Sequence, residues 1–282
     1  MLTLVTGIEG FTGRHVKAEL EAHGHTAVGL NSDLTDAEAV SDEILALQPD
    51  SVIHLAGIAF VAENNANAFY DVNLVGTRNL LDALAKHTPK LSSALITSSA
   101  NVYGNSTGGV LDENVRPNPS NDYAVSKLAM EYMTRLWGNK LPFCIVRPFN
   151  YTGVGQNEKF LIPKIVKHFQ NKEPIIELGN LDVWREFGDV RTVAAVYRML
   201  VENCPVGETF NVCTGKTYSL KEVITLCEKL TGHKIEVKVN PEFVRENEVR
   251  ELKGDNSKLM KVINTYPQHT FEETLSWMLK SN

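Results

Sequence analysis

The sequence has 282 residues, of which 43% are hydrophobic and 22% are charged. These values are ordinary for a globular protein and allow one large domain or one and a half. The formal net charge is −6, so the chain offers no broad basic surface. Nucleic acid and anionic membranes are therefore not expected as partners, and any anion must be bound at a local site formed by a few residues.

The cysteines and the first residues indicate the cellular compartment in which the protein is expected. Cys144, Cys204, Cys213 and Cys227 form no C-x-x-C pair, and we expect them to be reduced and structural. The opening MLTLVTG is typical of a strand entering a turn, not of a secretory signal. No apolar run approaches the roughly 20 residues that cross a bilayer. We expect a cytoplasmic protein, and no metal site is predicted.

Apolar runs and amphipathic segments alternate through the first half of the chain. Runs typical of strands cover residues 2–5, 27–30, 51–55, 94–99 and 143–148, and segments typical of helices cover 16–20, 37–47, 66–84 and 124–137. This alternation predicts a parallel sheet with helices on both faces, which is a Rossmann-type doubly wound α/β fold.

The pattern loosens from about residue 150. Apparent capping boxes at Ser219 with Glu222 and at Thr270 with Glu273 predict two helices. The segment KIEVKV, at 234–239, alternates like a half-exposed strand.

Two unequal parts follow from this change of pattern. We expect a dinucleotide-binding domain over residues 1–150 and a smaller mixed α/β lobe over 151–282, with some segments returning to the first domain. No repeat or flexible linker is visible between the two parts, which favours a shared interface.

Glycines follow the first predicted strand directly, in VTGIEGFTGRHV. Gly7, Gly10 and Gly13 are spaced G-x-x-G-x-x-G and open the first predicted helix. Glycines allow a tight turn and a close approach of the backbone, and a helix N-terminus offers free N–H groups to a pyrophosphate. The position between strand and helix favours dinucleotide binding over a purely steric role.

The residues after the second predicted strand bear on the choice of cofactor. NAD-binding folds often carry a carboxylate there that holds the ribose 2′-hydroxyl, whereas this chain has Asn31 and Ser32. Because no carboxylate follows this strand in the sequence, nothing obvious repels the 2′-phosphate of NADP(H). Arg14 could attract that phosphate. The sequence therefore slightly favours NADP(H) over NAD(H), with Arg14 as a solvated first-turn residue the alternative.

Tyr123 and Lys127 are four residues apart in a segment typical of a helix, so both lie on one face. A cation beside a tyrosine favours the phenolate and lowers a pKa that starts near about 10. Such a phenol is a usable acid or base near neutral pH. The bare Y-x-x-x-K spacing also arises by chance, so its meaning depends on the rest of the chain.

Further motifs occur in a fixed order along the chain. They are HLAG at 54–57, NLVGT at 73–77, SSANVYG at 98–104, RPFNYTG at 147–153, REFGDV at 185–190, NVCTG at 211–215 and GDNSKL at 254–259. With the glycine loop and Y-x-x-x-K, they resemble the extended short-chain dehydrogenase/reductase family, which contains NAD-dependent epimerases and dehydratases. The resemblance covers nearly the whole chain.

The resemblance implies catalytic roles for three residues. Tyr123 would be the acid/base, and Lys127 would lower its pKa and bind the nicotinamide ribose. Ser99 would hydrogen-bond the reacting sugar oxygen, while Ser98 is expected to support the strand end.

The resemblance also implies which residues bind the two ligands. Cofactor contacts are expected from Gly7, Gly10, Phe11, Gly13, Arg14, Asp33, Leu34, Leu55, Ala56, Gly57, Asn73, Tyr123 and Lys127. Substrate contacts are expected from Ser99, Asn101, Asn150, Arg185, Asn211, Arg245 and Glu248. Arginines suit a diphosphate, although Arg185 and Arg245 could instead form surface ion pairs. Asp33 could instead cap the helix that begins near Ala37.

The residues after Ser99 discriminate between the reactions of the family. Its dehydratases carry an acidic residue directly after the catalytic hydroxyl, and its 3,5-epimerase/reductases carry a cysteine two positions after it. Ala100 has no proton to move and Asn101 is a poor base, so neither reaction is expected. Nucleotide-sugar 4-epimerisation and reduction of a C4 ketone remain. A nucleotide-binding relative without turnover ranks lowest, because Tyr123 and Lys127 are present.

The motifs are most similar to the branch of the family that reduces GDP-4-keto-6-deoxy-D-mannose to GDP-D-rhamnose. Relatives that reduce dTDP- or CDP-linked 4-keto-6-deoxy sugars would share them. The expected partner is a nucleotide sugar, and a homodimer is expected because helices 66–84 and 124–137 pair between subunits in relatives. The same apolar helix faces could simply cover their own sheet.

Overall fold

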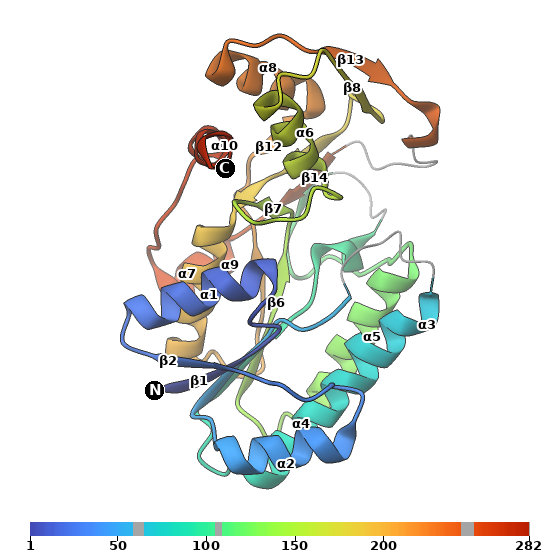
Figure 1. The fold of residues 1–282 in the computed structure, drawn as a ribbon. Coiled ribbons are helices and arrows are strands. Elements are labelled where there is room, and N and C mark those ends of the chain that lie inside the picture. The colour runs from blue at the N-terminus through green and yellow to red at the C-terminus, as the bar shows by residue number, and fades with distance from the viewer. Residues whose placement is uncertain (59–64, 105–108, 244–250, 282) are drawn as a thin grey trace.

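The centre of the molecule is a sheet of six parallel strands in the order β11-β6-β4-β3-β1-β2 (Figure 1). The computed structural model describes residues 1–58, 65–104, 109–243 and 251–281. The six strands are β1 (Leu2–Thr6), β2 (Thr26–Gly29), β3 (Ser51–His54), β4 (Ser93–Thr97), β6 (Phe143–Pro148) and β11 (Thr209–Val212). The expected Rossmann-type α/β fold is confirmed.

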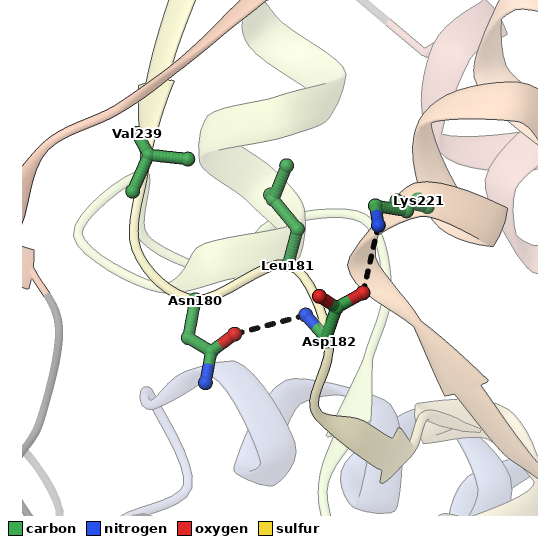
Figure 2. A pocket seen from close by; sticks show the side chains of 5 residues that line it. All are labelled: Asn180, Leu181, Asp182, Lys221 and Val239. Carbon is green, nitrogen blue, oxygen red and sulfur yellow. Dashed lines mark hydrogen bonds and ion pairs between the residues drawn. The ribbon is translucent and has the colours of Figure 1, made fainter.

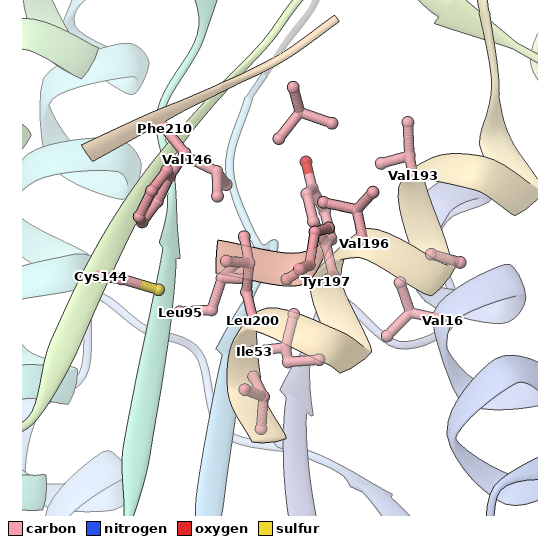
Figure 3. Packing of buried hydrophobic residues seen from close by; sticks show 14 of the residues in the cluster. Val16, Ile53, Leu95, Cys144, Val146, Val193, Val196, Tyr197, Leu200 and Phe210 are labelled. Carbon is pink, nitrogen blue, oxygen red and sulfur yellow. The ribbon is translucent and has the colours of Figure 1, made fainter. Parts of the chain in front are cut away.

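Helices cover both faces of this sheet (Figure 1). One face carries α1 (Phe11–Ala22), α7 (Val190–Asn203) and α9 (Ser257–Ile263), and the other carries α2 (Ala37–Leu47), α4 (Thr77–His87) and α5 (Asp122–Arg135). On the first face, Val16, Tyr197 and Leu200 pack against Ile53 and Leu95 of the sheet (Figure 3). Each fully buried side chain of this kind contributes about 1.5–3 kcal/mol, so both helix layers are fixed firmly to the strands.

The helix expected over residues 66–84 is not regular. It consists of α3 (Ala66–Tyr70), a π-helical segment (Asp71–Gly76) and α4. The buried side chain of Asn73 accepts a hydrogen bond from the Ile58 backbone N–H at 2.9 Å and donates to Ser126 Oγ at 3.1 Å. The wider turn therefore coincides with a side chain that ties this segment to the loop after β3 and to α5, and π turns are frequent at functional sites.

A second lobe contains α6 (Leu161–Gln170), α8 (Leu220–Thr231) and α10 (Phe271–Lys280) around their own apolar core (Figure 1). The parallel pair β8 (Ile175–Leu178) and β13 (Glu236–Val239) lies at its outer side. Both predicted capping boxes are confirmed, at the starts of α8 and α10.

Short strands connect segments that are far apart in the chain. They are β5 (Val110–Leu111), β7 (Tyr151–Thr152), β9 (Trp184–Glu186), β10 (Gly188–Asp189), β12 (Thr217–Ser219) and β14 (Glu251–Gly254). Four of them form a sheet in the order β12-β9-β14-β5, and β7 pairs with β10. The short helical turns Ala100–Tyr103 and Pro241–Phe243 complete the described elements.

Two expectations about the whole chain concern its cysteines and its helices. Cys144, Cys204, Cys213 and Cys227 are free thiols, as predicted. Every helix in the described ranges is too short or too polar to reach across a lipid bilayer.

Candidate active site

The glycine loop joins β1 to α1 and is packed tightly. Gly7 has φ +70°, and a Cβ on Gly13 would lie 2.2 Å from the Gly7 carbonyl oxygen. In this fully described part of the chain, the first turn of α1 has neither a side-chain cap nor an acidic residue. Its N–H groups and the positive end of the helix dipole are therefore available to an anion. These residues fit the pyrophosphate of a bound dinucleotide.

The loops after β1 and β3 meet beside this turn. The chain leaves β1 for β2 on one side and returns to β3 on the other, and dinucleotides bind at such a switch point. A Cβ on Gly7 would lie 3.1 Å from the backbone nitrogen of Ala56, so the two loops are in contact. Leu55, Ala56 and the exposed Gly57 thus lie next to the glycine loop.

Ser99, Tyr123 and Lys127 come together where β4 ends. Ser99 is the N-cap of the turn Ala100–Tyr103, and its Oγ accepts from the Asn101 N–H at 3.1 Å. Tyr123 lies on the first turn of α5, and the Ser99 hydroxyl is close enough to its phenol to influence the pKa of that phenol. One turn further, Lys127 Nζ donates to the Thr97 carbonyl at 2.9 Å.

Burial sets the protonation of this group. It raises the pKa of Tyr123 to about 12, against a smaller lowering by the nearby Ser99 hydroxyl. It lowers the pKa of Lys127 to about 8, and the Glu131 carboxylate acts in the opposite direction. In this structure the Lys127 ammonium is directed to a backbone carbonyl and burial dominates the pKa of Tyr123, so a lowering of that pKa by Lys127 stays a prediction. At neutral pH the phenol carries its proton and can act as an acid.

A buried ion pair lies next to these residues and was not anticipated from the sequence. Glu131 of α5 accepts from Arg147 of β6 at 2.7 and 2.9 Å, and Ser98 Oγ donates to the same carboxylate at 2.6 Å. Ser98 thus supports the strand end, as expected. The available signal was the spacing of Tyr123, Lys127 and Glu131, which repeats every four residues on one helix face.

Asn211 belongs to the same buried network instead of an open site. Its side chain is 0% exposed, accepts from the Tyr103 hydroxyl at 2.7 Å and donates to the Leu111 carbonyl at 2.9 Å. Both ends of the amide are therefore engaged within the fold. This placement disagrees with the expected substrate contact and gives Asn211 a structural role.

The end of β2 differs from its sequence-based interpretation. Glu43 of α2 accepts hydrogen bonds from the backbone and side chain of both Asn31 and Ser32, at 2.6–3.0 Å. A carboxylate therefore stands at the strand end, although none follows β2 in the sequence. The premise that no carboxylate stands at this strand end is wrong, because Glu43 comes from the following helix and only folding brings it to this place.

Two other predicted cofactor residues, Asp33 and Leu34, follow β2 closely in the chain. Asp33 is exposed and accepts hydrogen bonds from Thr35, which lower the pKa of its carboxyl, while Leu34 is buried. The alternative role of Asp33 as a helix N-cap is wrong, since Asp36 caps α2 by accepting from the Ala39 N–H.

The N-terminal turn of α1 faces the second lobe. The exposed Arg14 donates from Nη2 to the Gly155 carbonyl at 3.3 Å, so in this structure its guanidinium contacts the segment after β7. Phe11 stacks on Tyr151 with ring centroids 6.1 Å apart, and the Tyr151 hydroxyl lies 2.8 Å from Thr12 Oγ1.

The remaining predicted substrate residues occupy different places. Asn101 is half-buried in the turn after Ser99, Asn150 is exposed between β6 and β7, and Arg185 is half-buried on β9, where its Nη1 donates to the Trp184 carbonyl at 2.8 Å. Arg245 and Glu248 lie outside the described residues.

A cavity of about 370 Å³ lies in the second lobe (Figure 2). It is lined by Asn180, Leu181, Asp182, Lys221 and Val239, and the Lys221 ammonium is 2.7 Å from the Asp182 carboxylate. Its described lining includes none of the predicted site residues. The cavity and the residues around Ser99 are therefore distinct features of the molecule.

Comparison with known proteins identifies the family. The model of the NAD dependent epimerase/dehydratase family matches residues 3–213, which contain the glycine loop, Ser99, Tyr123 and Lys127. The chain belongs to this family. Like the other members of the NAD dependent epimerase/dehydratase family, it is an enzyme that works with a nicotinamide dinucleotide.

Two relatives with assigned activities align with nearly the whole chain. GDP-6-deoxy-D-talose 4-dehydrogenase of Aggregatibacter actinomycetemcomitans is 36% identical over 288 residues, covering 100% of this chain and 98% of the relative. GDP-6-deoxy-D-mannose reductase of Pseudomonas aeruginosa is 34% identical over 295 residues, covering 98% of this chain and 95% of the relative.

A solved structure from the same family has the same fold. RMD from Pseudomonas aeruginosa, in complex with NADPH, superimposes with a TM-score of 0.90 at 31% identity, covering 99% of this chain and 97% of that chain.

Proposed function

We propose that this enzyme reduces the C4 ketone of GDP-4-keto-6-deoxy-D-mannose and forms GDP-D-rhamnose, which is GDP-6-deoxy-D-mannose. The observation that carries the proposal is the protonated phenol of Tyr123 beside Ser99, which begins a turn that continues with Ala100 and Asn101. This arrangement offers an acid to a ketone oxygen, while neither following residue can move a carbon-bound proton. The activities assigned to the two relatives support the same chemistry.

The mechanism follows from the placement of three side chains. Bound NAD(P)H supplies the hydride that adds to the ketone carbon. Tyr123 protonates the developing alkoxide, and Ser99 donates a hydrogen bond to the same oxygen. Holding acid and carbonyl together removes part of the entropic barrier, and one positioned donor contributes about 10²–10³-fold in rate.

Binding of the nucleotide sugar is assigned to the second lobe and the strand ends. Asn101 lies in the turn after β4, and Asn150 lies just after β6. Arg185 offers a permanent positive charge to the diphosphate. Arg245 and Glu248 stay proposals from the sequence. Lys127 would bind the nicotinamide ribose, and the loop of Gly7 and Gly13 would hold the pyrophosphate.

NADPH is proposed as the hydride donor, with NADH as an alternative. Arg14 could reach a 2′-phosphate only by leaving the Gly155 carbonyl, and Glu43 at the end of β2 would repel one. The NADPH bound to the solved relative supports the first choice, and Glu43 favours NADH.

A second product has a specific observation in its favour. The relative with 36% identity is a dehydrogenase of GDP-6-deoxy-D-talose. That sugar differs from 6-deoxy-D-mannose in configuration at C4, so the two products result from hydride addition to opposite faces of one ketone. Nucleotide-sugar 4-epimerisation remains an alternative, since it uses the same Tyr and Ser groups.

Association into a homodimer is also proposed. Three large apolar or aromatic side chains of the α5 region are exposed, namely Val125 at 38%, Tyr132 at 64% and Leu136 at 77%. Light scattering of the purified protein distinguishes a dimer from a monomer.

A substrate panel tests the proposed function. Purified enzyme is mixed with NADPH or NADH and with GDP-, dTDP- or CDP-linked 4-keto-6-deoxy sugars, and cofactor oxidation is followed at 340 nm. Oxidation with the GDP-linked ketone is expected to be fastest, and NMR of the product gives the configuration at C4. No oxidation with any ketone overturns the proposal.

A further inference from the structure

A buried ionic contact inside the first domain lies next to the turn that carries Ser99. Glu131 and Arg147 are 2% and 5% exposed, and the guanidinium binds both carboxylate oxygens. Such a bidentate contact fixes the orientation of both groups. Neither residue contacts the reacting atoms in the mechanism above.

The ion pair contacts the residues on both sides of Ser99. On one side, Ser98 Oγ donates to Glu131 at 2.6 Å. On the other, Tyr103 ends the turn, accepts from Arg147 Nη1 at 3.0 Å and has its ring 4.9 Å from the guanidinium carbon. The residue before Ser99 and the last residue of its turn are therefore attached to one rigid unit.

The same unit includes the helix of the proposed acid. Glu131 lies on α5, about two turns after Tyr123. Because α5 carries both residues, Glu131 links the backbone that presents Tyr123 to the backbone that presents Ser99. The placement of Ser99 beside Tyr123 is thus set by a helix and an ion pair.

Stability alone does not account for such a pair. Desolvation offsets most of the attraction between buried charges, so apolar packing would hold these elements equally well. Directional hydrogen bonds differ from apolar contacts because they fix orientation as well as proximity. The pair is therefore suited to placing a group for chemistry.

We propose that the Glu131–Arg147 pair is a positioning unit that holds Ser99 against Tyr123 by fixing Ser98 and Tyr103. It acts on the rate through Ser99 and does not touch the substrate. The proposal rests on the proposed function in one respect, namely that Ser99 binds the reacting oxygen.

A double-mutant cycle tests this role, because residues that act through a common group are not additive. Ser98→Ala and Tyr103→Phe each remove one hydroxyl and leave both charges paired. Each is expected to lower kcat by about 10- to 100-fold, since small displacements of reacting groups have effects of this size. In a Ser99→Ala background neither substitution should lower kcat further, and Ser98→Thr, which keeps the hydroxyl, should recover most of the loss.

Glu202→Gln serves as the matched control. It removes one carboxylate partner of Arg198, which joins α7 to α1 away from Ser99. It should leave kcat unchanged in both backgrounds. Equal losses with and without Ser99, or losses confined to KM and to the urea midpoint, overturn the positioning role.

A second measurement does not depend on the substrate. In protein labelled with ¹³Cζ-tyrosine, the Tyr123 signal reports on the surroundings of its hydroxyl, which include Ser99. Ser98→Ala and Tyr103→Phe should shift this signal in the same direction as Ser99→Ala does, and an unchanged signal overturns the positioning role. A wild-type enzyme that reduces no ketone overturns the proposed function alone.

Discussion

The segments after β4 and after β2 leave the same sheet but are held in different ways. After β4, Ser98 and Tyr103 are buried and bound to the Glu131–Arg147 pair. After β2, Asn31 and Asp33 are exposed, and the half-buried Glu43 holds the backbone. Breaking a buried ion pair costs about 3–5 kcal/mol, whereas a hydrogen bond to a charged group such as Glu43 contributes about 1.5–3 kcal/mol. The segment after β4 is suited to placing reacting groups, whereas the segment after β2 can only adjust the preference between NADPH and NADH.

If this contrast holds, the largest effect comes from the acid beside β4. Tyr123→Phe removes the proton donor, and kcat for ketone reduction should fall by about 10²–10⁴-fold. Cofactor affinity, measured by fluorescence titration, should change little. Tyr132→Phe on the exposed side of the same helix is the control and should have no effect. Retained turnover in Tyr123→Phe would remove this residue from the proposed role.

A smaller loss is expected when the hydrogen-bond donor to the sugar oxygen is removed. Ser99→Ala should lower kcat by about 10²–10³-fold. Ser99→Thr, which keeps the hydroxyl, should be less affected. Steady-state assays with the 4-keto sugar measure both variants, and equal kcat values for Ala and wild type would contradict the assignment.

The pH dependence reports on Lys127. Burial lowers its pKa to about 8, so the ammonium form is lost as the pH rises above that value. Tyr123 keeps its proton in this range, because its pKa is about 12. The ratio kcat/KM should therefore be level near neutral pH and fall about tenfold per unit above pH 8. A profile that stays flat to pH 10 is incompatible with a required charge on Lys127.

Substitutions at the end of β2 should change only the preference between NADPH and NADH. Glu43→Gln removes the charge and keeps the side-chain shape, and it should raise the NADPH:NADH ratio of kcat/KM by roughly two- to fivefold. Asp42→Asn, an exposed neighbour on α2, should leave the ratio unchanged. A ratio that is the same in Glu43→Gln and wild type would show that Glu43 is too far from the ribose to discriminate.

The second lobe provides the smallest expected effect. Thr270→Ala breaks the capping box of α10 and should lower the free energy of unfolding by about 1 kcal/mol. Because the helix lies outside the described contacts of Ser99 and Tyr123, kcat should stay the same. Urea unfolding and the standard assay measure the two quantities.

The sequence predicted those features that local patterns encode. Alternating periods predicted the parallel sheet, and the spacing of serine and threonine to glutamate predicted two helix starts that the structure confirms. The π-helical turn around Asn73 was not predicted; it coincides with a long-range contact between Asn73 and the loop after β3.

Long-range placement explains the other differences. Glu43 reaches the end of β2 from the next helix, and Asn211 is satisfied by Tyr103, which is 108 positions away. The pKa of Tyr123 could not be read from the Y-x-x-x-K spacing, because burial, and not the neighbouring lysine, dominates it. Burial and distant partners are properties of the fold, so no local pattern carries them.

Transfer of deuterium tests the central claim most directly. The enzyme is given GDP-4-keto-6-deoxy-D-mannose and NADPH deuterated at the transferred position, and the product is analysed by NMR. The account predicts one deuterium at C4 of the sugar, with none at C5 or C6. In D₂O with ordinary NADPH, no solvent deuterium should enter the carbon skeleton. Absence of deuterium at C4, or solvent deuterium at C5, would contradict a reductase that uses Tyr123 as its acid.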